Sequence, residues 1–289
     1  MKTTRPPGSR KTVVVTGCSS GFGRATALHL AQQGWQVFAT VRQESDQASL
    51  LAEATVHDHA AGLIPVICDI TNGRHIDQLK HTVLAATHQL NGLVNNAGTA
   101  FPAPLELLPL EDLRAQLEIN VIAQLAVVQA LLPLLKAAPG MIINISSESG
   151  RVAFPITGSY HMSKFALEAM SDVLRIELAP FGVRVVVLEP GSSPTAIWDI
   201  SRRRARAAIS GSGISAYAPL IAAVEGAAAR RAAGGFPPQR LADLVLKVLN
   251  DPRPRARYAL PVQAAWTIAL RQWLPDAWWD WIVRRLLKW

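Results

Sequence analysis

Short apolar runs, many rich in β-branched residues, alternate with helical patterns along the first two thirds of this chain. The helical patterns cover residues 23–33, 111–136, 159–179 and 238–250. The apolar runs lie at 13–15, 35–41, 63–68, 93–94, 142–145 and 183–188, and a shorter one lies at 258–260. Apolar strands without polar alternation are typical of a parallel sheet that is covered on both faces. The sequence therefore predicts an α/β fold with a doubly wound parallel sheet and helices on both faces.

The chain has 289 residues, of which 49% are hydrophobic, enough for a sizeable core. We expect one domain over residues 12–262. The alternation ends near residue 195, where an Ala- and Arg-rich stretch predicts a helical substrate cap with a loop over about 195–235. Residues 1–11 are basic and lack the apolar region of a signal peptide, so we expect a disordered leader. Residues 263–289 form a Trp-rich C-terminal extension, expected to be helical.

Several classes of protein fit the composition poorly. No uninterrupted apolar run reaches membrane-spanning length. Two cysteines, Cys18 and Cys68, give no disulfide framework and favour a reducing, cytoplasmic setting. The triplet His57-Asp58-His59 could suggest a metal, but no third ligand stands out, so we interpret it as a polar loop and expect no metal site.

The formal net charge is +8, and much of the excess lies in the leader, in Arg202–Arg204 with Arg206, and at the C-terminal end. Such clusters could meet nucleic acid, anionic lipid or an acidic substrate. They could equally be solvated helix faces and tails. These clusters lack the aromatic-basic interleaving of a nucleic-acid platform, so we expect no nucleic-acid partner.

A glycine-rich turn joins the first predicted strand to the first predicted helix. It places Gly17, Gly21 and Gly23 within the stretch 16–23, together with Ser19, Ser20 and Phe22. Glycine lets a backbone turn tightly and approach a pyrophosphate, whose charge is favoured at a helix N-terminus. A glycine triplet could also be a plain turn, but its position after the first strand favours a dinucleotide site.

The end of the second predicted strand suggests which dinucleotide binds. An acidic residue there commonly holds the ribose hydroxyl of NAD. This chain has no acid at 38–42 and carries Arg42 instead. A guanidinium could pair with the 2′-phosphate of NADP, so NADP(H) is favoured over NAD(H), although Arg42 could also be an ordinary surface arginine.

Tyr160 and Lys164 stand four residues apart, so on a helix they project from one face. A neighbouring cation favours the phenolate, which predicts a lowered pKa for Tyr160 and a usable proton donor and acceptor. His161 lies about 100° around the helix, and we interpret it as a packing residue.

Taken together, these motifs resemble the short-chain dehydrogenase/reductase family. The resemblance covers about residues 11–200 and extends to the branch with 17β-hydroxysteroid and retinol dehydrogenases. It rests on 16–23, Asp69-Ile70, Asn95-Asn96-Ala97-Gly98, Asn120, Ser147, Tyr160 with Lys164, and Pro190-Gly191 with Thr195. It implies a Rossmann-type fold and a homodimer or homotetramer. It also implies that Asp69 and Ile70 lie near the adenine, that Asn96, Ala97 and Gly98 lie at the adenosine-side ribose, and that Pro190, Gly191 and Thr195 lie near the nicotinamide.

The resemblance also implies a catalytic tetrad. Tyr160 would be the general acid or base, and Lys164 would lower its pKa and hold the nicotinamide ribose. Ser147 would hydrogen-bond the substrate oxygen, although Ser146 could be the aligned hydroxyl. Asn120 would hold a water that relays protons from Lys164, although an isolated buried asparagine is often only satisfied by backbone groups.

Residues that select the substrate are harder to find. Ser149, Phe154, Trp198 and Tyr217 are candidates to line an apolar pocket for a lipophilic alcohol or ketone. In the tail, Pro275 could open a helix in which Trp279, Ile282, Val283 and Leu286 form one apolar stripe. That helix could dock on the domain or a partner subunit, or it could touch a membrane peripherally, since Trp with basic residues is typical of membrane interfaces.

The sequence thus predicts an NADP-favouring oxidoreductase that interconverts an alcohol and its ketone or aldehyde, including steroid- or retinoid-like substrates. A dinucleotide-binding regulator without turnover, and a membrane-surface protein on the same fold, are the alternatives. A related epimerase is disfavoured because the chain lacks the larger C-terminal domain of that branch.

Overall fold

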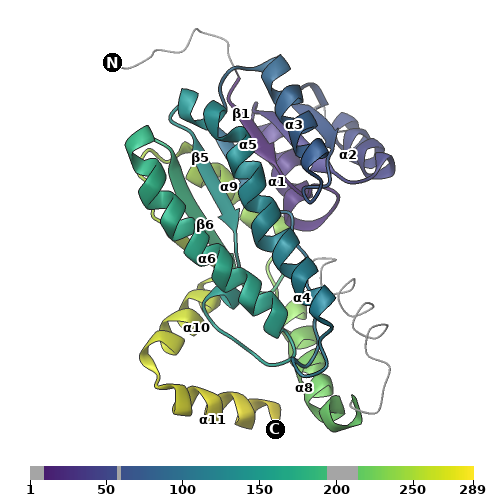
Figure 1. Cartoon of the computed structure of the whole chain (residues 1–289), viewed down its shortest axis with the longest axis vertical. Coiled ribbons are helices and arrows are strands. Elements are labelled where there is room, and N and C mark those ends of the chain that lie inside the picture. Colours follow the sequence, from purple (N-terminus) through teal and green to yellow (C-terminus); the bar gives the residue numbers. More distant parts are fainter. Residues whose placement is uncertain (1–9, 57–59, 194–213) are drawn as a thin grey trace.

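A single parallel sheet organises the molecule, as the computed structural model shows (Figure 1). The structure describes residues 10–56, 60–193 and 214–289. The seven strands follow the order β3-β2-β1-β4-β5-β6-β7, and every neighbouring pair is parallel. They are β1 (Thr12–Val15), β2 (Gln36–Val41), β3 (Leu63–Ile67), β4 (Gly92–Asn95), β5 (Met141–Ile145), β6 (Arg184–Pro190) and β7 (Arg257–Leu260). The predicted doubly wound α/β fold is confirmed.

Successive strand residues face opposite sides of the sheet, and each side has its own core. In β1, Val13 and Val15 belong to one core, whereas Val14 belongs to the other. The first core is closed by α1 (Gly21–Gln32), α2 (Glu44–Val56) and α9 (Pro238–Asn250). The second is closed by α3 (Gly73–Ala86), α5 (Ala123–Ala137) and α6 (Gly158–Leu178). Apolar strands without polar alternation are the consequence of this double cover.

One long helical stretch contains a π-helical turn. α4 (Leu110–Leu117) runs through a π-helical turn, η2 (Glu118–Ile122), into α5. π-Turns inside α-helices are frequent at functional sites, and this one carries the buried Asn120. The stretch 110–137 is long and apolar enough to cross a membrane, but Val127, Leu131 and Leu135 are buried in the second core, as expected for a core helix.

Short 3₁₀ turns link several elements, namely η1 (Ala60–Gly62), η3 (Glu148–Gly150) and η4 (Ala179–Phe181). The triplet His57-Asp58-His59, the leader through residue 9 and the stretch 194–213 lie outside the described residues, and with them Thr195, Trp198 and the arginines at 202–206. Elsewhere, among the described residues, no cluster of three His, Cys, Asp or Glu side chains could hold a metal. Cys18 and Cys68 are free, buried thiols.

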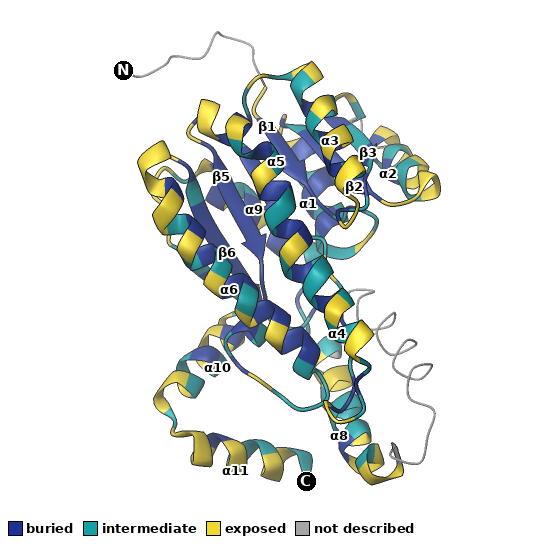
Figure 2. Cartoon of the chain, viewed as in Figure 1, coloured by how far each residue is buried: buried dark blue, intermediate teal, exposed yellow. Residues whose placement is uncertain are grey.

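The C-terminal part adds helices beyond the carboxyl ends of the strands. α8 (Ile214–Ala233) precedes α9, and after β7 come α10 (Val262–Trp273) and α11 (Asp276–Leu287). α10 and α11 project below the sheet and are largely exposed (Figure 2). Pro275 precedes the last helix as expected. The predicted stripe is only partly right: Trp279 and Val283 pack inward, whereas Leu286 is exposed.

Candidate active site

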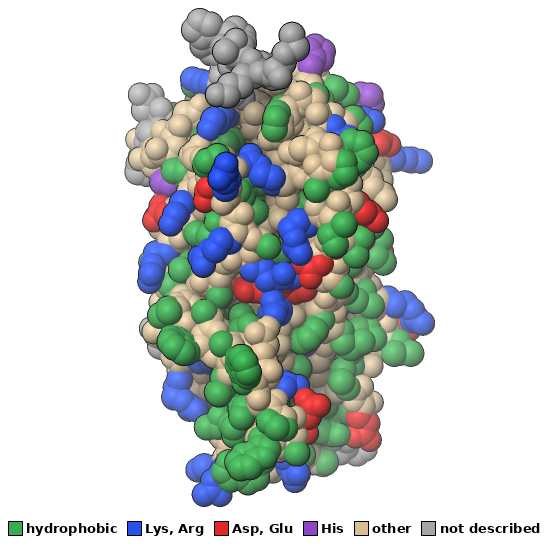
Figure 3. Space-filling view, turned by 90° about the vertical axis from the view of Figure 1, so that its left-hand side faces the viewer, with side chains coloured by type: hydrophobic (Ala, Val, Ile, Leu, Met, Phe, Trp, Pro, Cys, Tyr) green, Lys and Arg blue, Asp and Glu red, His purple; other side chains and the backbone are tan. Residues whose placement is uncertain are grey.

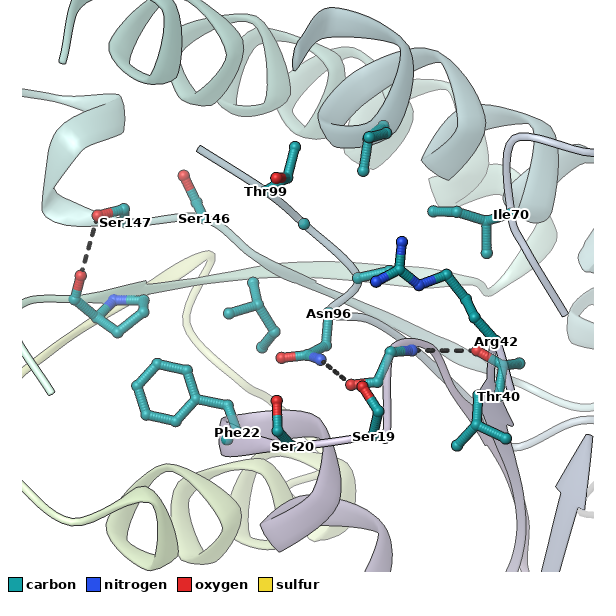
Figure 4. A pocket seen from close by; sticks show the side chains of 18 of the residues that line it. Ser19, Ser20, Phe22, Thr40, Arg42, Ile70, Asn96, Thr99, Ser146 and Ser147 are labelled. Carbon is teal, nitrogen blue, oxygen red and sulfur yellow. Dashed lines mark hydrogen bonds between the residues drawn. The ribbon is translucent and has the colours of Figure 1, made fainter. Parts of the chain in front are cut away.

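A cleft of about 290 Å³ crosses the carboxyl ends of β1 to β6, where ligands bind in open parallel sheets. Figure 4 shows side chains from several strand ends facing this space. Most residues predicted to bind the cofactor line the cleft: Gly17, Ser19, Ser20, Gly21, Phe22, Arg42, Asp69, Ile70, Asn96, Ala97, Gly98, Tyr160, Lys164, Pro190 and Gly191. Ser147 lines it as well. Segments separated by more than 100 residues thus meet in one site, as the motif order predicts.

The glycine turn is shaped by close backbone contacts. Gly17 has φ +71° and Gly21 has φ +57°, a region that favours glycine. A Cβ on Gly23 would lie 2.2 Å from the carbonyl oxygen of Gly17 and 2.4 Å from Nδ2 of Asn96. Gly23 therefore lets the first turn of α1 close against the loop, which leaves the α1 N-terminus facing the cleft.

Asn96 and Thr16 tie the end of β4 to this turn. The Asn96 Nδ2 donates to the carbonyl oxygens of Thr16 (2.8 Å) and Gly17 (3.1 Å). The Thr16 Oγ1 accepts from the backbone N–H groups of Asn96 (2.9 Å) and Ala97 (3.0 Å). Four hydrogen bonds thus fix the two loops on either side of the point where strand order reverses. The sequence pattern includes Thr16 only as part of the turn; in the structure, the Thr16 hydroxyl links the end of β1 to the end of β4.

At the other end of the cleft, Arg42 extends into the open space from the end of β2 (Figure 4). Asp69, at the end of β3, lies near it. Burial opposes ionisation of Asp69, but hydrogen bonds from Thr71 and the charge of Arg42 outweigh it and hold the pKa of that carboxyl below its usual range. The Thr71 N–H and hydroxyl donate to Asp69 at 2.9 Å and 2.8 Å. This end of the cleft therefore carries an exposed cation, Arg42, and an anion, Asp69, that Thr71 holds in place.

Tyr160 and Lys164 lie one turn apart on α6, as predicted, and both are buried. The Lys164 Nζ donates to the carbonyl oxygen of Ile145 at 2.8 Å and lies 5.7 Å from the centre of the Tyr160 ring. Burial lowers the pKa of Lys164 to about 8. The ammonium group is thus held between β5 and α6 within reach of the phenol.

The predicted lowering of the Tyr160 pKa is wrong for the protein alone. Burial raises the pKa of Tyr160 to about 12; a hydrogen bond with Ser147 opposes this rise, and the charge of Glu148 adds to it. Spacing along the helix reveals the neighbouring cation but not the loss of water around the phenol, and here desolvation dominates.

Ser147, at the end of β5, is the hydroxyl that faces Tyr160. Its Oγ donates to the carbonyl oxygen of Pro190 at 3.2 Å and accepts from the N–H of Ser149 at 3.1 Å. Ser146, the alternative, also lines the cleft, but its Oγ has no hydrogen-bond partner among the described residues. The contact with Tyr160 favours Ser147 over Ser146 as the paired hydroxyl.

Asn120 does not line the cleft but supports it from behind. Its Oδ1 accepts from the N–H of Thr99 at 2.9 Å, and its Nδ2 donates to the Thr99 carbonyl oxygen (3.0 Å) and to Ser163 Oγ (2.9 Å). Ser163 in turn donates to the carbonyl oxygen of Tyr160 at 2.7 Å. Asn120 thus links the loop after β4 to the helix that carries Tyr160. Its part in a proton relay stays a prediction.

Two glutamines that sequence reasoning missed hold the same loop. Gln116 accepts from the N–H of Phe101 at 2.9 Å and donates to the Thr99 carbonyl oxygen at 2.6 Å. Gln124 donates to the carbonyl oxygen of Ala97 at 2.8 Å. Both are fully buried. The sequence does contain a signal for them. Gln116, Asn120 and Gln124 are amides spaced by four residues on the apolar side of a helix, and buried amides need hydrogen-bond partners.

Ser149, Phe154 and Tyr217, three of the residues predicted to select the substrate, do not line this cleft, and the fourth, Trp198, lies outside the described residues. Phe154 packs against Trp279 with ring centres 5.7 Å apart. The Tyr217 hydroxyl donates to Glu106 at 2.7 Å, and its ring stacks on Trp289 at 6.0 Å. Ser149 offers its carbonyl oxygen to His161 Nδ1 at 2.9 Å, which supports the packing role of His161. Glu106 and Trp289 hold Tyr217 outside this cleft, and its part in substrate binding stays a prediction.

Two contacts place the C-terminal part beside the site. Glu148, next to Ser147, is buried and pairs with Arg231 of α8 at 3.0 Å. Burial raises the pKa of Glu148, and Arg231 offsets part of that rise. A Cβ on Gly191 would lie 3.3 Å from the Cβ of Ala264 in α10. α8 and α10 therefore border the cleft at the Ser147 end.

Comparison with known proteins identifies the family to which this site belongs. The short chain dehydrogenase family matches residues 11–205. The chain is a member of that family. The seven-stranded order and the flanking helices match a short-chain dehydrogenase from Streptomyces avermitilis, with a TM-score of 0.75, 27% identity and coverage of 97% of this chain and 96% of that one.

Individual relatives differ in how much of the chain they match. A 3-amino-tetrahydro-pyrrolizinone reductase from Xenorhabdus hominickii is 42% identical over 193 residues, which are 66% of this chain and 64% of that protein. Mouse retinol dehydrogenase 5 is 40% identical over 197 residues, 67% of this chain and 60% of that protein. The match thus spans less than two thirds of these two relatives. An NADPH-dependent 3-dehydrocapnine reductase from Ornithobacterium rhinotracheale is 32% identical over 282 residues, covering 95% of this chain and 96% of that protein. The predicted resemblance to the family and to retinol dehydrogenases is confirmed.

Proposed function

We propose that this protein is an NADP(H)-preferring oxidoreductase that interconverts an alcohol and its ketone or aldehyde. The observation that carries the proposal is the meeting of Ser147, Tyr160 and Lys164 in the same cleft as the glycine turn and Arg42. A dinucleotide-binding regulator without turnover would need only the glycine turn and Arg42.

The cleft fits an extended dinucleotide. The glycines of the turn lack side chains that would collide with neighbouring backbone atoms, so the turn can stay tight beside the cleft. The N–H groups at the N-terminus of α1 can bind a pyrophosphate there. Asp69 and Ile70 would lie beside the adenine, and Lys164 would hold the nicotinamide ribose. When bound, the nicotinamide supplies or accepts the hydride at the carbon that carries the substrate oxygen.

The side chains of the chain itself handle the proton. In reduction, the Tyr160 hydroxyl donates its proton to the substrate oxygen, and in oxidation the phenolate takes it back. Ser147, hydrogen-bonded to Tyr160, donates to the same oxygen and stabilises the negative charge that develops there. The Lys164 ammonium favours the phenolate that forms in reduction. The high pKa of Tyr160 suits the proton-donating direction near neutral pH.

Arg42 supports the preference for NADP(H). It enters the cleft at the end of β2, where no acidic residue stands, and it can pair with a 2′-phosphate. The name of the capnine reductase, which matches nearly the whole chain, includes NADPH. Arg42→Ala should lower the ratio of kcat/KM for NADPH to that for NADH by at least about tenfold, since charge-assisted pairs contribute 1.5–3 kcal/mol. An unchanged ratio would refute the role of Arg42.

The substrate class is proposed to be lipophilic. The name of mouse retinol dehydrogenase 5, which is 40% identical over 197 residues, includes a lipophilic alcohol and supports this class. A panel of aliphatic, steroid-like and retinoid-like ketones and aldehydes, followed by loss of nicotinamide absorbance with NADPH, tests the activity. Turnover of at least one lipophilic carbonyl supports it. Tight NADPH binding with no turnover of any member would favour the regulatory alternative.

A further inference from the structure

α10 has an apolar side that no part of the described chain covers. Val262, Trp266, Leu270 and Trp273 are spaced by four, four and three residues, so they form one stripe along the helix. Trp266 is 73% exposed and Trp273 is 86% exposed. The opposite side of α10 carries the buried Ala264 and Ile268. The helix is therefore apolar on two sides, and only one of them contacts the domain.

α11 repeats this arrangement with basic residues added. Trp278 and Trp281 are 63% and 59% exposed, and they share one face with Arg285. The guanidinium of Arg285 lies 5.8 Å from the centre of the Trp281 ring. Aromatic rings with a cation at their side suit a boundary between an apolar and an aqueous phase.

Both helices are held firmly enough to present these side chains. Trp279 packs in a small core with Val152 and Ile268, and Arg271 pairs with Asp276 across the turn between the helices. Trp289 stacks on Tyr217 of α8. The exposed tryptophans therefore belong to an ordered surface and not to a frayed end.

The charge of this region complements an anionic surface. Residues 262–289 contain four basic side chains (Arg271, Arg284, Arg285, Lys288) and two acidic ones (Asp276, Asp280), a net charge of +2. In Figure 3, hydrophobic side chains gather toward the lower end of the face, the level of α10 and α11 in Figure 1, with Lys and Arg at the margin. Trp beside Arg and Lys is the composition of membrane-interface helices.

We propose that the exposed sides of α10 and α11, here called the Trp surface, dock on a lipid bilayer that carries anionic headgroups. The tryptophans would enter the headgroup region, and Arg284, Arg285 and Lys288 would meet the lipid phosphates. A second copy of the chain is the other occupant to consider, since Trp and Arg are also enriched in contacts between subunits. Two copies would, however, bring together surfaces that each carry a net charge of +2, and like charges facing each other are unfavourable. The proposal does not depend on the catalytic activity, because lipid binding can be measured without substrate.

Co-sedimentation of the full chain with vesicles of phosphatidylcholine, with or without 30% phosphatidylglycerol, tests the proposal. We expect binding to the anionic vesicles that weakens with salt. The double variant Trp266→Ser/Trp273→Ser should weaken it by at least about tenfold, from the lost apolar contact. Arg284→Gln/Arg285→Gln should weaken it on the order of tenfold or more.

Matched controls separate the Trp surface from general effects of charge or hydrophobicity. Val56→Ser/Leu105→Ser removes side chains that are 79% and 60% exposed elsewhere, and Arg74→Gln/Arg240→Gln makes the same change in net charge. Both should bind vesicles like the unmodified chain, and NADPH titration checks that all variants are folded. Equal loss in the controls would overturn the proposal. Absence of binding to the anionic vesicles would overturn it as well, and a drop in oligomeric mass for Trp266→Ser/Trp273→Ser would then assign the surface to a second copy.

Discussion

The cofactor side of the cleft and the C-terminal part of the chain are built in different ways. At the ends of β1 and β4, Thr16 and Asn96 hydrogen-bond to each other, and the glycines stand where a side chain would collide with backbone atoms. After β7, one side of each helix packs against the domain, and large aromatic residues remain exposed on the other. Contacts within the fold determine the first region, whereas the second leaves an apolar outer surface exposed.

A large contrast is expected between the two neighbouring serines of the cleft. Ser147→Ala should lower kcat by about 10²–10³-fold, because a donor aimed at the developing oxyanion is lost. Ser146→Ala should lower kcat by less than about threefold, since an unpaired hydroxyl contributes little. Steady-state kinetics with the best carbonyl substrate decides this, and a reversed order would assign the reaction to Ser146.

In the C-terminal part, the effect of replacing a tryptophan on the free energy of unfolding should depend on whether that tryptophan is buried or exposed. Trp279→Ala should lower the free energy of unfolding by about 3 kcal/mol, because the ring is buried against Phe154. Trp266→Ala should change it by no more than about 0.5 kcal/mol, as for other exposed positions. Urea unfolding of both variants tests this, and equal losses would show that the outer side of α10 is covered after all.

Two glycines allow a direct comparison of the regions. Gly23→Ala should cost about 1–3 kcal/mol of stability by overpacking against backbone atoms, and it should weaken NADPH binding by about tenfold or more as the turn shifts. Gly226→Ala in α8 meets only the flexible end of Arg230 and should stabilise by about 0.5–1 kcal/mol. Thermal unfolding with NADPH titration measures both changes, and similar effects of the two substitutions would contradict the comparison.

A smaller effect is expected from pH. Burial lowers the pKa of Lys164 from 10.5 to about 8, so the unfolded chain binds more protons than the folded chain between these values. Stability from this group should therefore rise from pH 8 toward pH 10. Above about pH 9 the raised pKa values of the buried thiols of Cys18 and Cys68 act in the opposite direction, and above pH 10 so does that of Tyr160, so the rise is measured between pH 8 and pH 9. Lys164→Met should abolish the rise in urea-unfolding stability, and the exposed Lys247→Met should keep it. A rise that persists in Lys164→Met would have another source.

The same difference explains what could be predicted from the sequence. The strands, the glycine turn and the pair Tyr160 and Lys164 depend on short-range spacing and apolar pattern, and these predictions are confirmed. The pKa of Tyr160 depends on burial by distant segments, which spacing does not reveal. The direction of Tyr217 depends on Glu106 and Trp289, which lie far from it in sequence. Gln116 and Gln124 were missed because their partners belong to the loop after β4.

We propose that Tyr160 transfers the proton in a cleft where most of the predicted cofactor contacts are made by other residues. The most direct test is to measure kcat and the NADPH dissociation constant of Tyr160→Phe on the same preparation. We expect a fall in kcat of about 10²–10⁴-fold with a dissociation constant within about threefold of that of the unmodified protein, because general acid catalysis contributes this much to the rate. Undiminished kcat in Tyr160→Phe would contradict it.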